Sequence, residues 1–97
     1  MNLVVMAETR ERFSPPDAEH ILQLFQSASL PFLDGPSRER ERARVQLAVL
    51  KLAAGDVKQL EHWLREAEID WRDVLVASGL ENDDWDRVLA CAGFRVP

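Results

Sequence analysis

The sequence has little of what small proteins often use to build a reactive site. Its 97 residues include one cysteine, Cys91, which excludes an internal disulfide and a multi-cysteine metal site. The two histidines, His20 and His62, have no second histidine or cysteine at ligand spacing, so we expect no metal ion and no cofactor. The four glycines all fit turns or helix ends, which leaves no phosphate-binding loop.

Long hydrophobic runs are missing as well. The apolar run near the N-terminus, residues 3–6, is too short for the core of a signal peptide, and no segment approaches the roughly 20 apolar residues of a membrane-spanning helix. A single cysteine suits a reducing compartment. We therefore expect a cytoplasmic protein that does not bind membranes.

What the sequence does contain is typical of helices. Hydrophobic residues make up 46% and charged residues 30%, as in an ordinary globular domain, and 97 residues suffice for one core. Leucine, alanine, glutamate and arginine are helix formers, and they dominate the composition. These features predict an all-α fold, a small orthogonal or irregular bundle of about five helices around a central buried helix.

Capping residues and apolar periodicity set the expected helix boundaries. Residues 1–13 show neither signal, so we predict a flexible N-terminal arm, followed by a single helical domain over residues 14–97. Ser14 caps a helix that ends near Ser27, and Ser37 caps one that ends at Ala54. Asp56 caps a third helix that ends near Glu68.

The helix expected over residues 38–54 has two opposed apolar faces. At about 100° per residue, one apolar stripe is formed by Ala43, Leu47, Leu50 and Ala54. A second stripe, on the opposite side, is formed by Val45, Ala48, Val49 and Leu52. A helix that is apolar on both sides must be covered on both sides. We therefore predict that it is the central helix of the bundle.

Residues 70–80 and 84–94 repeat one another at a spacing of fourteen. In each copy an aspartate, Asp70 or Asp84, caps a two-turn helix, and a glycine, Gly79 or Gly93, ends it in the left-handed conformation. Two copies are too few for a solenoid. We therefore interpret the repeat as two helices that use the same capping residues.

One resemblance covers about a third of the chain. The motif LxxLxLxxGD starts at Leu47 and is followed by DWRDVL, which starts at Asp70. Together they resemble a set of small uncharacterised bacterial all-α proteins. The resemblance implies a bacterial origin and a helical fold, and it supplies no site residues.

The net charge of −5 lies entirely in the C-terminal part. Residues 1–55 carry seven basic and seven acidic side chains, whereas residues 56–97 carry five basic and ten acidic ones. An acidic surface disfavours nucleic acid and anionic membrane, since both are polyanions. It is compatible with a basic protein partner, and equally with a role in solubility alone.

No group of residues points to catalysis. Cys91 takes the place of Ala77 in the repeat, which predicts a packed thiol, and the aspartates near it are explained as caps. The alternating charges of residues 38–44 spread over the helix surface and are explained by pairing at i,i+3. We therefore expect no enzyme.

Four residues are the candidates for partner binding. Trp63 lies at the edge of its apolar stripe, and Val76 points away from the core face of its helix. Glu81 and Asp84 belong to a run of carboxylates at the head of the last helix. These observations favour a small interaction module, of adaptor, regulatory or immunity type, whose acidic C-terminal face binds a protein. We expect a monomer or a weak homodimer.

The alternative is a DNA-binding regulator of helix-turn-helix type, because two short helices are joined through Gly79. Its would-be recognition helix begins with several carboxylates, which would repel the phosphate backbone. Nucleic acid is therefore not the expected partner.

Overall fold

The computed structural model describes residues 1–31, 33, 35 and 38–97, and in this part of the chain it contains five α-helices and no strand. The helices are α1 (Leu3–Arg12), α2 (Pro15–Ser27), α3 (Glu39–Ala53), α4 (Val57–Ser78) and α5 (Trp85–Cys91). The all-α prediction is confirmed. Ser37, the predicted cap of the central helix, lies outside the described residues.

The prediction of a flexible arm over residues 1–13 was wrong. The side chain of Asn2 caps α1 by accepting hydrogen bonds from the backbone N–H groups of Val4 and Val5 at 2.9 and 3.3 Å. The helix packs against α2 and α3, and its residues Val5, Glu8 and Thr9 are buried. Two of these three are polar, so hydrophobic periodicity could not reveal the buried face.

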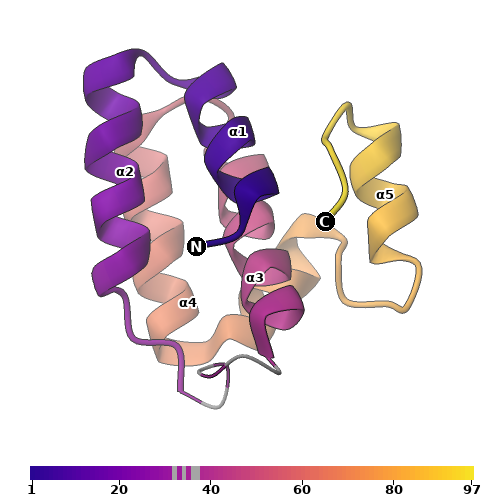
Figure 1. The fold of residues 1–97 in the computed structure, drawn as a ribbon. Coiled ribbons are helices and arrows are strands. Elements are labelled where there is room, and N and C mark those ends of the chain that lie inside the picture. The colour runs from indigo at the N-terminus through magenta and orange to yellow at the C-terminus, as the bar shows by residue number, and fades with distance from the viewer. Residues whose placement is uncertain (32, 34, 36–37) are drawn as a thin grey trace.

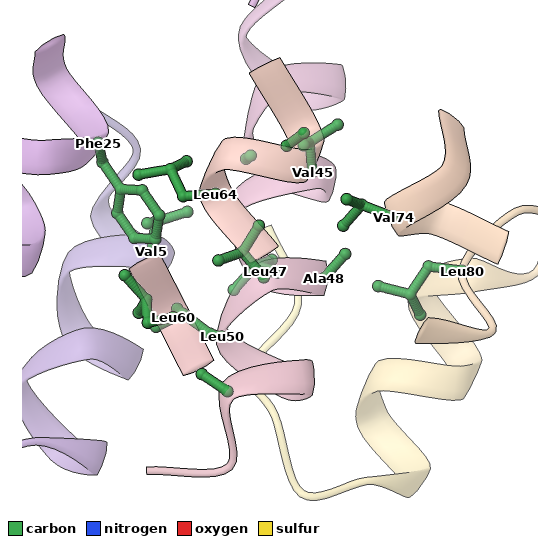
Figure 2. Close-up of a cluster of buried hydrophobic side chains, with 14 of the residues drawn as sticks. Val5, Phe25, Val45, Leu47, Ala48, Leu50, Leu60, Leu64, Val74 and Leu80 are labelled. Atoms are coloured by element: carbon green, nitrogen blue, oxygen red, sulfur yellow. The ribbon is translucent and has the colours of Figure 1, made fainter. Parts of the chain in front are cut away.

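The central helix α3 is buried on two sides. Its residues Val45 to Leu50 form an unbroken buried run. Figure 2 shows Leu47 and Leu50 in a group with Leu60, whereas Val45 and Ala48 point toward Val74 and Leu80. One face therefore packs toward the first part of α4, and the other toward the second part of α4 and the loop beyond it. The prediction of two opposed buried faces is confirmed, although Leu52 is only partly buried and Ala54, which follows the helix as its left-handed C-cap, is exposed.

Helix α4 is bent at Asp70, so it joins two helices that the sequence predicts as separate. Asp70 has extended backbone angles, φ −153° and ψ 100°. Its Oδ1 accepts hydrogen bonds from the backbone N–H and the Nε of Arg72, at 3.1 and 3.0 Å, as the N-cap of the second leg. The first leg lies beside α2, and the second runs across to α5 (Figure 1).

Both copies of the repeat end as predicted. Gly79 and Gly93 have φ values of 80° and 85°, in the left-handed region. After them, the N–H of Leu80 donates to Leu75 O at 2.9 Å, and the N–H of Phe94 donates to Leu89 O at 3.0 Å. These are Schellman bonds, and they turn Leu80 and Phe94 back into the core.

The N-terminal helix and the C-terminal tail are fastened together by a buried carboxylate. Glu8 is 1% exposed, and its Oε1 accepts hydrogen bonds from the backbone N–H and Nη1 of Arg95 at 2.6 and 3.2 Å. Its Oε2 accepts one from Nε of Arg12 at 3.0 Å, and the same guanidinium lies 3.6 Å from the ring centroid of Phe94. The two ends of the chain are thereby held to one another across α1.

Candidate interaction surface

Three of the four predicted partner-binding residues lie together where the second leg of α4 turns into α5. We call Val76, Glu81, Asp83 and Asp84 the α4–α5 corner. All four side chains are exposed, and Val76, at 63%, is among the most exposed large hydrophobic residues in the described part of the chain. The corner therefore consists of one exposed apolar side chain in the last turn of α4 and three exposed carboxylates in the segment between α4 and α5.

The corner is held in place by basic residues of α3. Arg44 donates from Nε and Nη2 to the carbonyl oxygen of Leu80, at 2.9 and 2.5 Å, and from Nη2 to that of Asn82 at 3.4 Å. Lys51 donates to the carbonyl oxygen of Ser78 at 2.8 Å. Because these cations bind backbone carbonyls, they position the loop and leave its carboxylates unpaired.

Trp85 anchors the start of α5 between two arginines. Its ring is buried, and the guanidinium carbons of Arg40 and Arg44 lie 4.6 and 5.5 Å from the ring centroid. Arg40 also approaches Asp86, with 3.9 Å between Nη2 and Oδ2. The sequence argument assigned these arginines to pairing within the helix, and Arg44 does pair with Glu41 at 3.2 Å. Pairing within the helix does not account for the contact of both arginines with the Trp85 ring. The signal for this contact was that Arg40 and Arg44 are four residues apart and so lie on one side of the helix.

The charge of the corner is not neutralised within the molecule. Among the described residues, none forms a hydrogen bond or ion pair with the side chains of Glu81, Asp83 or Asp84. Although Asp84 takes the N-cap position of α5, its side chain makes no cap hydrogen bond. The cap role that the sequence assigns to Asp84 is therefore absent, which leaves this carboxylate free to meet solvent or a partner.

Trp63 does not join the corner. It lies on the first leg of α4, before the bend at Asp70, and its ring packs partly buried against the core. Its ring also meets that of His62 edge-on, with 5.0 Å between the ring centroids. Since the bend separates the two legs, the four predicted partner-binding residues do not form one surface.

The remaining predictions for reactive residues have mixed outcomes. Cys91 was expected to be packed, and it is exposed, because it lies on the outer side of the short helix α5. Trp71 is only partly buried. His20 and His62 are exposed, and Nε2 of His20 lies 3.5 Å from Oε1 of Glu61. No cluster of potential metal ligands occurs among residues 1–31, 33, 35 and 38–97.

The bend in α4 contains the one carboxylate in the described chain whose pKa clearly departs from its ordinary value. The pKa of Asp70 is lowered below 3.8 because the side chain and the backbone N–H of Arg72 both bind the ionised carboxylate. The pKa of the Arg72 guanidinium is raised by the same contact. Because this pair shapes the backbone of α4, we assign it a structural role.

Comparisons with protein-family models, with curated proteins and with solved structures gave no match to this chain. The resemblance to small bacterial proteins thus stays a prediction. None of the helices in the described chain is long and apolar enough to cross a membrane.

Proposed function

We propose that the chain is a protein-interaction module that binds a basic protein through the α4–α5 corner. One observation carries the proposal: three carboxylates within four residues have no described partner, on a loop whose backbone is fixed by Arg44 and Lys51. Some carboxylates elsewhere, such as those of Glu8 and Glu11, are paired with Arg95, whereas Asp17 and Glu66 are single carboxylates that also have no described partner.

A fixed acidic loop supports binding because its own backbone loses little conformational entropy when a partner docks. Close like charges on an exposed surface repel each other at a cost of a few tenths of a kcal/mol per pair, which a basic partner would remove. Exposed Val76 adds an apolar contact at the edge of the same surface. Localisation in the cytoplasm and a monomeric or weakly dimeric state belong to this proposal.

The test is affinity capture with three forms of the full chain. The first is the wild type, and the second is Glu81→Gln/Asp84→Asn, which removes two charges without removing a cap hydrogen bond. The third is Asp17→Asn/Glu66→Gln, which removes the same charge where neither side chain has a described partner.

We expect the wild type and the control variant to retain a basic protein that the corner variant loses. The retained protein must also bind the purified wild-type chain, with an affinity that falls as salt rises. Equal retention by all three forms would contradict the proposal.

The DNA-binding alternative has no observation of its own in its favour. Six residues separate Ser78 from Trp85, which is longer than the three or four residues of a helix-turn-helix turn. A mobility-shift assay with duplex DNA at low salt tests it, since electrostatic binding to any sequence is strongest there.

A further inference from the structure

One buried polar side chain of the described chain lacks a partner. The buried polar residues are Glu8, Thr9, Gln46 and Ser78. Glu8 is bound by Arg12 and Arg95, and the hydroxyls of Thr9 and Ser78 donate to backbone carbonyls at 2.7 and 3.1 Å. Gln46 is 3% exposed, and its side-chain amide makes no hydrogen bond to a described residue. A polar group without a protein partner is expected to bind water or a ligand, so the surroundings of this amide call for an explanation.

The amide of Gln46 faces a pocket. Every fully enclosed side-chain nitrogen or oxygen in the described chain has a hydrogen-bond partner, so the unpaired amide must reach open space. Gln46 lines a cavity of about 330 Å³ between the start of α1, the end of α2 and the first half of α3. This is within the size range of sites that hold small molecules.

The described residues of the lining carry both carboxamides and charges. Asn2 and Gln26 add two more carboxamides to that of Gln46, and Phe25 also belongs to the lining. Arg42 and Glu39 carry opposite charges, and the guanidinium of Arg42 also donates to carbonyl oxygens at the end of α2. Of the three carboxamides, that of Gln46 is the one that belongs to a buried residue and has no described hydrogen-bond partner.

We infer that this pocket binds a small planar molecule, with Gln46 as the residue that recognises it. A carboxamide presents a donor beside an acceptor, and its complement is a ligand edge with an acceptor beside a donor. Nucleobases have such edges, and glutamine pairs with adenine in this bidentate way. Ring carboxamides offer the same edge. The inference does not depend on the proposed function, because the α4–α5 corner contributes no residue to this pocket.

The test follows the side-chain amide of Gln46 by NMR in the uniformly ¹⁵N-labelled full chain. Adenine, cytosine and nicotinamide are added separately to millimolar concentrations, which distinguishes a nucleobase from a ring carboxamide. We expect at least one of them to shift the Gln46 amide signal along a saturable curve.

Two variants show whether Gln46 makes the contact. Gln46→Met keeps the volume and removes the amide, and it should weaken binding by about tenfold or more, since one or two hydrogen bonds are lost. Gln23→Met changes an exposed glutamine of α2 outside the lining, and it should bind as the wild type does.

Two results would overturn the inference. The first is the absence of a saturable shift with all three compounds, which would mean that the amide is satisfied by water alone. The second is binding to Gln46→Met as tight as binding to the wild type. The titration of the wild type decides the question even if the variant does not fold.

Discussion

The side chain of Glu8 links the N-terminal helix to the C-terminal tail. Its carboxylate accepts three hydrogen bonds from two arginines, one of which belongs to the C-terminal tail. A buried carboxylate is stable only when such donors replace its lost hydration. The guanidinium groups of Arg12 and Arg95 stay partly exposed to water, whereas the Glu8 carboxylate is almost fully buried. Of the three charged groups, Glu8 therefore depends most on these hydrogen bonds.

Replacing Glu8 with glutamine should therefore destabilise the fold. Glutamine keeps the shape but loses the charge that strengthens these hydrogen bonds, and we expect a loss of about 1–3 kcal/mol in the free energy of unfolding. Urea denaturation of the wild type and the variant measures it. Glu11→Gln is the matched control, because Glu11 also pairs with Arg95 but is 60% exposed, and it should cost under about 1 kcal/mol. Equal losses for the two variants would contradict the role given to burial.

Asp70 provides a test that depends on pH. Its pKa in the folded chain is lowered by the side-chain and backbone hydrogen bonds of Arg72, so the carboxylate stabilises the fold above its unfolded pKa of 3.8. That stabilisation is lost as the pH falls through the lower, folded value. NMR titration should find the Asp70 carboxyl below 3.8 in the wild type and higher in Arg72→Gln, which keeps only the backbone bond. An unchanged Asp70 pKa in Arg72→Gln would show that the side-chain contact does not stabilise the ionised carboxylate.

Helix α3 is the element on which the packing of the others depends. It contacts α1 and α4, and its arginines hold the loop before α5. Because apolar side chains cover both of its faces, a truncation there leaves a cavity that neighbours on two sides would have to fill.

Leu50→Ala should cost about 2–5 kcal/mol in the free energy of unfolding, as expected for a buried leucine. Leu52→Ala, on the same helix but only partly buried, should cost clearly less. Chemical denaturation of both variants measures the difference. Similar losses at the two positions would mean that the two-sided burial of α3 does not govern its stability.

The sequence predicted the elements whose signals are local and missed those that depend on distant contacts. The cap at Asp56 and the glycine endings at Gly79 and Gly93 are set by neighbouring residues, and the structure contains all three. Helix α1 was missed because its buried face includes Glu8, whose partner Arg95 is 87 residues away. No periodicity within ten residues can report such a pairing.

The α4–α5 corner also combines features with local signals and features that depend on distant contacts. The exposure of Val76 follows from its phase on the helix, and the charges of Glu81 and Asp84 are evident in the sequence. The contact of Arg44 with the carbonyl of Leu80, which it makes in addition to its ion pair with Glu41, depends on how α3 meets the second leg of α4. Trp63 is separated from the α4–α5 corner by the bend at Asp70. The sequence predicts two helices there but does not specify the angle between them.

In the described part of the molecule, the N-terminal helix and the C-terminal tail are held together, whereas the α4–α5 corner is exposed. Contacts of Glu8 and Phe94 hold the two termini together, and α5 lies on the far side of α3 from α2 (Figure 1). Of the exposed large hydrophobic residues, Leu3 lies on α1, whereas Ile69 and Val76 lie on α4, on either side of its bend at Asp70. The α4–α5 corner differs from the other two positions because it also contains three carboxylates without a described partner.

The rate at which a captured basic partner associates with the chain tests the role of this corner most directly. Charge complementarity acts mainly on association, whereas dissociation reports the short-range contacts. Surface plasmon resonance at low and at physiological salt should show slower association for Glu81→Gln/Asp84→Asn than for the wild type, with a smaller dependence on salt and little change in dissociation. Asp17→Asn/Glu66→Gln, with the same net charge, should associate nearly as the wild type does. Equal association rates for the two variants at both salt concentrations would show that the corner does not guide the partner.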